Sequence, residues 1–415
     1  MSMIRPFKAV RPAEGKAHLI AALPYDVMNS EEAREIVKGN PISFLHVDKS
    51  EIDLPIGTDL YDESVYLKAR ENLYNLITKG DLIQDEKPCL YLYQQVMGGR
   101  SQTGIVCCAS VTEYEQDLIK KHEHTRAAKE ADRIKHVDVT NAQTGPIFLT
   151  YRTITEIERK MNEIMVQKPI YNFIADDKVQ HIAWKIDNDI DIEFLVNKFK
   201  QVPSLYIADG HHRAASAVKI GQKRKSSNPN HTGNEEYNYF LAVIFPDSHL
   251  AIMDYNRVIK DMNGLLKDDF LHKVSEKFIL EDISPDSQFK PNTLHTFGMF
   301  TPYQKWMKLT AKPGSYPEND PVDSLDVSIL QKNLLEPILG IGDPRTDNRI
   351  DFVGGIRGIS ELEKRVKSGE ACAFSMFPTS IDQLMNIADA NEVMPPKSTW
   401  FEPKLRSGLF IHLLD

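Results

Sequence analysis

The sequence predicts a mixed α/β (α+β) protein, with a large first domain over residues 1–260 and a smaller α+β domain over residues 261–415. One basis is the stretch 204–217, where an apolar run meets Asp-Gly and then an alanine-rich segment, as in a strand, a tight corner and a helix. A second is a pair of β-rich runs across residues 89–111 that flank Met97-Gly98-Gly99-Arg100, which is typical of a hairpin. A third is the change, after the first domain, to short alternating helical and hairpin patterns. A chain of 415 residues is long enough for two such domains.

The remaining elements follow from periodicity and from capping or breaking residues. Asn29 or Ser30 can cap a helix that Gly39-Asn40-Pro41 ends, and Gly80 closes another helical spacing. In chain order we also expect a strand over 42–47, a helix over 59–79, a helical or partly helical charged run over 114–138, a strand over 147–151, helices over 154–164 and 192–199, a mobile polar loop over 221–238, and strands over 239–245, 250–253, 371–377 and 408–413.

The composition limits the classes of function. The formal net charge is -9, with 41% hydrophobic and 26% charged residues, so the chain is globular and nucleic acid is an unlikely partner. The N-terminus lacks a signal pattern, and no window approaches the roughly 18 apolar residues of a membrane span, so we expect a cytoplasmic protein without membrane contact. The four cysteines have no metal or redox spacing and should be reduced. The composition does not decide whether the protein forms a homo-oligomer.

The corner after the predicted strand is the best candidate for chemistry. Gly210 allows a backbone conformation closed to other residues, so the amides of His211 and His212 can face outward at the start of the helix. Together with Arg213 and the positive end of the helix dipole they form an anion site, and phosphate is the expected anion. The alternative is structural: Asp209 caps the helix and the histidines belong to the core.

A stripe of charges precedes this corner. Glu123, Arg126, Glu130 and Arg133 are spaced by three, four and three residues, which places them on one face of a helix. The stripe is either a ladder of salt bridges or a charged wall for a polyanionic substrate.

Common catalytic motifs are missing. The sequence has no Walker loop, dinucleotide fingerprint, nucleophile-elbow serine or metalloprotease helix. Zinc could use histidines such as His122, but no zinc-binding spacing supports it, so no metal ligands are predicted. The acid, imidazole and guanidinium groups that remain suit phosphoryl transfer.

Ala208-Asp209-Gly210-His211-His212-Arg213 is similar to the phosphate-binding corner of the ParB/sulfiredoxin superfamily, and it most resembles that of the free-serine kinases. Further stretches look like a large bacterial family catalogued as a domain of unknown function: Arg5-Pro6-Phe7, Pro24-Tyr25-Asp26-Val27, the run 40–47, Glu123-His124-Thr125-Arg126 and the run 394–401. The resemblance implies a ParB/sulfiredoxin-like mixed-sheet domain.

It also implies a small-molecule phosphotransferase that phosphorylates free L-serine, or runs in reverse on phosphoserine. The donor would be ATP, ADP or pyrophosphate with Mg²⁺. The kinases' catalytic glutamate has no clear counterpart, so Asp26 and Glu123 join Asp209, His211 and His212 as catalytic candidates. The expected phosphate contacts are Gly210, His211, His212, Arg213, Arg126 and Arg133, and the expected substrate contacts are His124, Thr144 and Lys397.

The alternative is a non-catalytic nucleotide-binding regulator of the ParB type. ParB-type proteins carry an arginine-rich box at this corner, bind CTP and clamp DNA. The acidic balance and the lack of a clear helix-turn-helix weigh against that role.

Overall fold

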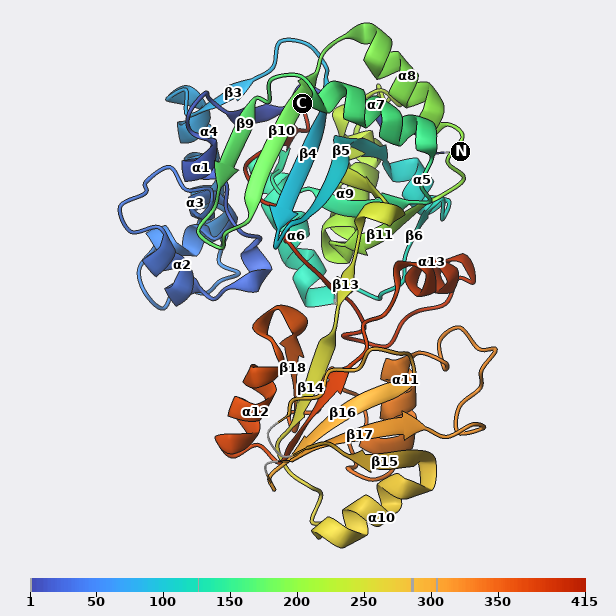
Figure 1. The fold of residues 1–415 in the computed structure, drawn as a ribbon. Helices are drawn as coiled ribbons and strands as arrows, with labels where there is room; N and C mark the ends of the chain where they lie inside the picture. The colour runs from blue at the N-terminus through green and yellow to red at the C-terminus, as the bar shows by residue number, and fades with distance from the viewer. Residues whose placement is uncertain (1, 126, 285–286, 304) are drawn as a thin grey trace. The chain divides into compact units, whose positions relative to one another are not determined.

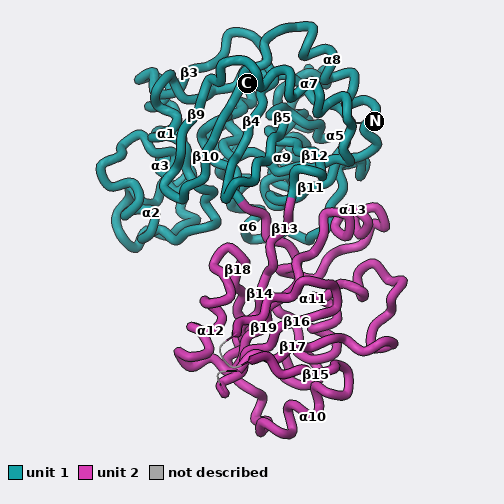
Figure 2. Tube along the Cα trace, in the orientation of Figure 1, with its two compact units in different colours: residues 1–250, 403–415 teal, residues 251–402 magenta. Residues whose placement is uncertain are grey.

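The computed structural model describes residues 2–125, 127–284, 287–303 and 305–415 (Figure 1). The chain forms two compact units, one made of residues 1–250 with 403–415 and the other of residues 251–402 (Figure 2). The boundary expected at residue 260 therefore falls inside the second unit, and the C-terminal segment returns to the first. This return matters for the site, because it brings residues such as Lys404 into the first unit.

The first unit is built on a mixed sheet, as the sequence predicts. Its order is β6-β11-β8-β12-β5-β4-β10-β9, with β1 also paired to β5. The β11–β6 and β12–β8 pairs are parallel and the other pairs are antiparallel. The strands are β1 (Ile4–Arg5), β4 (Leu90–Met97), β5 (Arg100–Ser110), β6 (Ile119–Lys120), β8 (Ile147–Tyr151), β9 (Tyr171–Ile174), β10 (Gln180–Ile186), β11 (Leu205–Asp209) and β12 (Tyr239–Pro246).

Helices of the first unit pack on this sheet and on one another. Ala214, Ala217 and Val218 on one side of α9 join the apolar core with strand residues such as Leu149 and Ile207. Helix α6 packs against both α9 and α4. The longer helices are α4 (Glu63–Thr78), α6 (Ala127–Thr140), α7 (Thr155–Met165), α8 (Asp189–Phe199) and α9 (His211–Ser227); the shorter elements are β2 (Val10–Pro12), α1 (Ala17–Ile20), η1 (Tyr25–Val27), α2 (Ser30–Ile36), α3 (Leu45–Asp48), η2 (Ser50–Asp53), β3 (Leu82–Gln84), α5 (Val111–Glu115), β7 (Ala142–Gln143), η3 (Glu236–Asn238), η4 (Asp247–His249) and β21 (His412–Leu413).

The second unit has an antiparallel sheet in the order β15-β17-β16-β19-β14-β18. Its strands are β13 (Ile252–Met253), β14 (Tyr255–Ile259), β15 (Phe278–Asp282), β16 (Thr296–Thr301), β17 (Lys305–Ala311), β18 (Ile350–Gly354), β19 (Cys372–Met376) and β20 (Trp400–Phe401); its helical segments are α10 (Lys267–Lys277), α11 (Asp326–Leu330), η5 (Gln331–Leu335), η6 (Gly355–Arg357), α12 (Ile359–Lys367) and α13 (Ile381–Asp389).

Local capping and turn signals predicted several elements well. The hairpin is confirmed, with Met97 paired to Arg100 across the turn. Helix α2 begins with a capping box, in which the Asn29 side chain accepts from the Glu32 amide and the Glu32 side chain accepts from the Asn29 amide.

Three sequence-based expectations were wrong. The predicted strand over 42–47 contains the start of a short helix, α3, because Phe44 and Val47 are both fully buried at a helical spacing. The predicted loop from residue 221 is helical as far as Ser227, since its Lys, Arg and Gln residues are good helix formers. Glu123 lies ahead of α6 and therefore does not share a helical stripe with Glu130 and Arg133.

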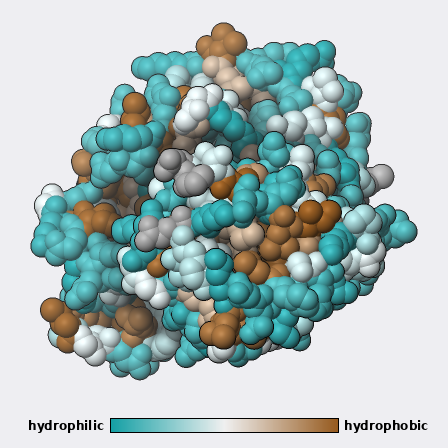
Figure 3. Space-filling view, turned by 60° about the horizontal axis from the view of Figure 1, so that its bottom comes forward, coloured by the Kyte–Doolittle hydropathy of each residue, from teal (hydrophilic) through white to brown (hydrophobic). Residues whose placement is uncertain are grey.

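All four cysteines are buried and free. None of the helices in the described ranges is long and apolar enough to cross a membrane. Figure 3 shows one face of the molecule, where hydrophobic side chains form separate patches among hydrophilic ones.

Candidate phosphate-binding corner and adjoining pocket

The corner between β11 and α9 has the predicted strand, glycine and helix order. Gly210 has a φ of +94°, a left-handed conformation that favours glycine. A Cβ at this position would also lie 2.9 Å from both Nε and Nη2 of Arg213. Glycine is therefore required for two reasons: the backbone conformation favours it, and the Arg213 guanidinium occupies the space that a Cβ would need.

Helix α9 opens directly at this corner. The Ala214 amide donates to the Gly210 carbonyl at 2.9 Å, so the amides of His211, His212 and Arg213 precede the first intrahelical hydrogen bond. The helix has 17 residues, and its N-terminal end carries the positive end of the helix dipole. This end of α9 is suited to an oxyanion.

Asp209 and Lys404 form an ion pair at the edge of the corner. The Lys404 Nζ lies 3.3 Å from Oδ2 of Asp209, and the Gly210 amide donates to Oδ1 at 2.8 Å. Burial alone would raise the pKa of Asp209, but the positive charges of Lys404 and Arg213 lower it to about 2. Asp209 is thus ionised near neutral pH and is a weak base.

Two buried histidines lie beside the corner. The rings of His122 and His211 meet edge to face with their centroids 4.5 Å apart. Burial lowers the pKa of His122 to about 4 and that of His211 well below its ordinary value, so both rings are neutral near pH 7. Within the described part of the chain, His211 Nε2 has no hydrogen-bond partner. Glu123, which is half exposed, has its Oε2 3.8 Å from His211 Nδ1.

Arg213 lies between two glycines. A Cβ at Gly145 would lie 3.5 Å from Arg213 Nη1 and 3.2 Å from Ser407 Oγ, so the side chain fills the space between Gly210 and Gly145. Its buried Nε has no hydrogen-bond partner among the residues described. The guanidinium is therefore positioned by shape, and its charge acts on Asp209 without a direct ion pair among the described residues.

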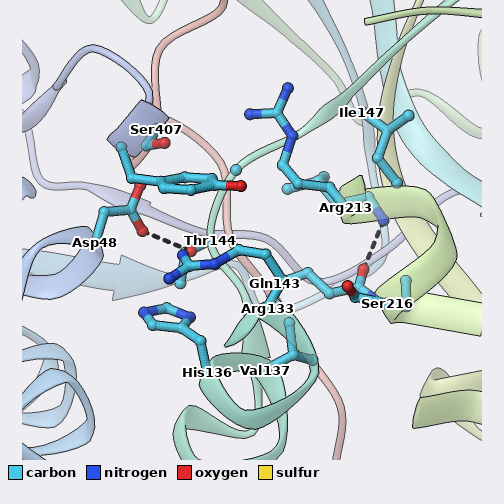
Figure 4. A pocket seen from close by; sticks show the side chains of 14 residues that line it. Asp48, Arg133, His136, Val137, Gln143, Thr144, Ile147, Arg213, Ser216 and Ser407 are labelled. Carbon is cyan, nitrogen blue, oxygen red and sulfur yellow. Dashed lines mark hydrogen bonds between the residues drawn. The ribbon is translucent and has the colours of Figure 1, made fainter. Parts of the chain in front are cut away.

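Arg213 also lines a small cavity of about 30 Å³ in the first unit (Figure 4). Arg133 faces this cavity, with Nη2 2.7 Å from Asp132 Oδ2 and its guanidinium carbon 4.0 Å from the centre of the Tyr25 ring. Asp48, on α3, is 6% exposed and accepts a hydrogen bond from the Thr144 hydroxyl at 2.8 Å. The cavity therefore adjoins the corner through Arg213 and has both signs of charge on its wall.

The structure brings most of the predicted residues together. Asp209, Gly210, His211, His212 and Arg213 form the corner, and Glu123 lies beside it. Arg133 and Thr144 are on the cavity wall with Arg213.

Four further residues belong to the predicted set: Asp26, His124, Lys397 and Arg126. Asp26 is exposed next to Tyr25, and His124 is exposed in the segment before α6. Lys397 belongs to the second unit, where it is exposed and its Nζ is 5.5 Å from the centre of the Tyr255 ring. Arg126 lies outside the described residues.

The charged stripe before the corner, predicted to be either a ladder of salt bridges or a charged wall, does not form a ladder in the described residues. Glu130 is buried and pairs with Lys219 of α9, and it accepts a hydrogen bond from the Thr125 hydroxyl at 2.7 Å. Arg133 pairs with Asp132. Glu130 thus joins α6, α9 and the segment before α6, whereas Arg133 faces the cavity.

Several residues of the site were missing from the predicted set, among them Tyr25, Asp48, Lys404 and Ser407. Lys404 is 195 positions from its partner Asp209. No local spacing could have revealed such long-range contacts, although the Pro403-Lys404 sequence marks a loop of the kind that often carries ligand contacts.

The fold and the corner together define a mixed α/β protein with a candidate oxyanion site at a helix N-terminus. A family model described as "Protein of unknown function (DUF1015)" matches residues 4–328, and the chain belongs to that family. Among curated proteins, none matches the sequence significantly.

Several solved structures are similar at low identity. A free serine kinase mutant in complex with AMP is 12% identical, with a TM-score of 0.36 over 72% of this chain and 87% of that one. A conserved hypothetical protein from Pyrococcus furiosus is 13% identical, with a TM-score of 0.35 over 75% and 95% of the two chains. C-terminally truncated SbnI from Staphylococcus aureus is 9% identical, with a TM-score of 0.36 over 74% and 87%. At these scores, the assignment of function depends on the site itself.

Proposed function

We propose that the protein is a small-molecule phosphotransferase that phosphorylates free L-serine, or removes the phosphoryl group from phosphoserine in the reverse direction. The observation that carries the proposal is the coincidence, at one corner, of the N-terminus of α9 with the Arg213 guanidinium, whose buried Nε has no hydrogen-bond partner among the described residues. Arg213 makes no ion pair with any described acidic residue, and a phosphoryl group would supply the missing negative charge.

The proposed reaction is a direct transfer. The acceptor hydroxyl oxygen attacks the terminal phosphorus of ATP, ADP or pyrophosphate, and the bond from that phosphorus to the bridging oxygen breaks. Arg213 and the first amides of α9 stabilise the charge on the transferred group, as in other phosphoryl-transfer sites. The neutral ring of His211, whose Nε2 has no hydrogen-bond partner in the described part of the chain, can hold a further oxygen without adding charge.

The proton of the acceptor hydroxyl needs a base. Glu123 is our first candidate, because it is half exposed and adjoins His211 at the start of α9. Asp26 is the second, because it follows Tyr25, whose ring packs on Arg133. Asp209 is better suited to holding Lys404 in place, since a carboxylate with a pKa of about 2 is a weak base.

A magnesium ion would enter with the phosphates of the donor. The described residues contain no group of three or more His, Cys, Asp or Glu side chains arranged around a metal ion. Mg²⁺ is usually held by substrate phosphates and by one or two carboxylates, and Asp209 could provide one of these at the corner. The ion would supply charge neutralisation to the phosphates.

The direct test is to incubate the pure protein with L-serine, Mg²⁺ and each donor in turn, and to measure phosphoserine. Arg213→Ala should lower kcat/KM by about 10²- to 10³-fold, the loss seen when one transition-state donor is removed. Arg159→Ala is the matched control, because Arg159 is an exposed arginine on α7 with a 69% exposed side chain.

The outcomes separate the alternatives. Nucleotide binding without turnover, lost in Arg213→Ala, would favour the nucleotide-binding regulator. If the protein shows no turnover, and if its phosphate binding does not depend on Arg213, the corner has only a structural role and the proposal is overturned.

A further inference from the structure

The charges on the cavity wall are incompletely paired. Arg133 is neutralised by Asp132, and its Nη2 lies 2.7 Å from that carboxylate. Asp48 and Arg213, in contrast, line the same cavity and form no ion pair with any residue in the described ranges. Asp48 acts on the Arg133 guanidinium through space but shares that cation with Asp132, and Arg213 acts in the same way on Asp209. The cavity therefore presents one carboxylate and one guanidinium without a direct ion-pair partner among the described residues.

Neutral groups complete the wall. His136 is 4% exposed, and burial together with the nearby Arg133 lowers its pKa, so it does not supply a counter-charge to Asp48 near pH 7. Burial also raises the pKa of the Tyr25 hydroxyl to about 12, which keeps it neutral. Thr144 donates to Oδ1 of Asp48 and leaves Oδ2 available as an acceptor.

A buried carboxylate that makes no direct ion pair, and shares its nearest cation with a second carboxylate, is costly to a folded protein. Asp48 is 6% exposed, so water cannot solvate it fully. The cavity beside it measures about 30 Å³, which suits a group the size of a water molecule or two and excludes a nucleobase. A primary ammonium group has the required size, the required charge and three donors.

We infer that Asp48 is the ammonium-binding residue of an acceptor pocket, and that this pocket selects small hydroxylated amines over hydroxy acids and polyols of the same size. The inference rests on the proposed function for the identity of the site as the acceptor side of a transfer. Asp48 fixes the amine at the inner end, and Arg213, which reaches both the cavity and the corner, faces the reacting end. The acceptor hydroxyl is thereby directed toward the corner.

The test compares ligands that differ in one group. L-serine and glycerate differ by an ammonium in place of a hydroxyl, and ethanolamine keeps the ammonium and hydroxyl of serine without its carboxylate. Titration calorimetry on the full chain, without any phosphoryl donor, should show that serine binds about 10- to 100-fold more tightly than glycerate, the usual worth of a charge-assisted hydrogen bond.

Asp48→Asn then tests the residue. Asparagine keeps the Oδ1 acceptor for Thr144 but removes the charge, so serine and ethanolamine should each lose about 10- to 100-fold in affinity while glycerate changes little. Asp176→Asn is the matched control at an exposed aspartate of the same unit. An unchanged ratio of serine to glycerate affinity in Asp48→Asn would overturn the inference. So would wild-type protein that binds glycerate as tightly as serine, a comparison that needs no variant to fold.

The two proposals fail differently. If serine binds through Asp48 and no donor phosphorylates it, the phosphotransferase proposal fails and the ammonium pocket stands. If glycerate and serine are phosphorylated equally well, the phosphotransferase activity stands and the pocket inference fails.

Discussion

Two charged clusters inside the first unit are built in opposite ways. Around Asp85, both guanidinium contacts of Arg11 measure 2.8 Å and the Lys185 Nζ lies at 2.9 Å, with the Tyr91 hydroxyl as a fourth donor. Around the candidate site, Asp48 has one hydroxyl donor and Arg213 has a buried Nε without an acceptor among the described residues. The first cluster is saturated by the protein, and the second is not.

The difference separates a structural role from a functional one. A saturated ionic cluster has little capacity left for a ligand, and removing one member leaves the others buried without a partner. An unsaturated cluster costs stability and is expected where a ligand completes it. The following predictions test this contrast.

The largest expected effect is on the saturated cluster. Asp85→Ala should lower the free energy of unfolding by about 3–5 kcal/mol, because Arg11 and Lys185 would lose their shared buried counter-ion. Urea denaturation of the variant and the wild type measures this loss in the free energy of unfolding. Glu35→Ala, which breaks the exposed pair with Lys38, should cost less than about 1 kcal/mol. A loss below 1 kcal/mol for Asp85→Ala would mean that the saturated cluster is not a stabilising feature.

As the pH falls, the stability that His122 contributes at the site should be lost before the stability that the Asp85 cluster contributes. The pKa of His122 is about 4 in the folded protein and near 6.5 when unfolded, so only the unfolded state takes up this proton as the pH falls through that range. Its contribution to stability is complete above pH 6.5, and about 3 kcal/mol is lost by pH 4.

Asp85, with a pKa of about 2, loses its contribution only as the pH falls below about 4. The free energy of unfolding, measured from denaturation curves at a series of pH values, should therefore fall less steeply with pH between pH 6.5 and 4 in His122→Asn than in the wild type. Equal slopes in this window would show that the buried ring of His122 does not resist protonation.

The elements of the corner could be predicted from sequence because their signals are local. A strand of Leu205 to Ile207, the Asp-Gly step and the alanine run lie within a few residues of one another. The predicted strand over 42–47 failed for the opposite reason. A six-residue stretch with four apolar residues fits either a strand or a helical turn, and the burial of Phe44 by distant residues decided the outcome.

The pocket could be predicted only in part. Thr144 and Arg133 were in the predicted set, but Asp48 was not, because it directly follows the run assigned to a strand and its burial depends on long-range packing of α3. Lys404 reaches Asp209 because the chain returns to the first unit after residue 402. Such returns leave no periodic signal in the sequence.

Lys404 gives a test of intermediate size. Lys404→Met keeps most of the side-chain volume and leaves Asp209 without its ion-pair partner, so the pKa of Asp209 should rise and its charge should compete with a bound phosphate. We expect kcat/KM for serine phosphorylation to fall by about 10- to 100-fold. Lys225→Met, near the far end of α9, is the control. Unchanged phosphate affinity and turnover in Lys404→Met would exclude Lys404 from the site.

Gly210→Ala should have the smallest effect on stability and should distinguish backbone strain from displacement of Arg213. Gly57 is the matched control, because both glycines have a φ of +94° but only a Cβ at Gly210 would meet Arg213, at 2.9 Å from Nε and Nη2. Each alanine should cost about 1–2 kcal/mol of stability in thermal unfolding. Phosphate binding should weaken in Gly210→Ala alone, since the guanidinium must move to make room. If both variants bind phosphate equally well, the position of Arg213 over the corner does not matter to the anion, and the corner resembles the saturated Asp85 cluster after all.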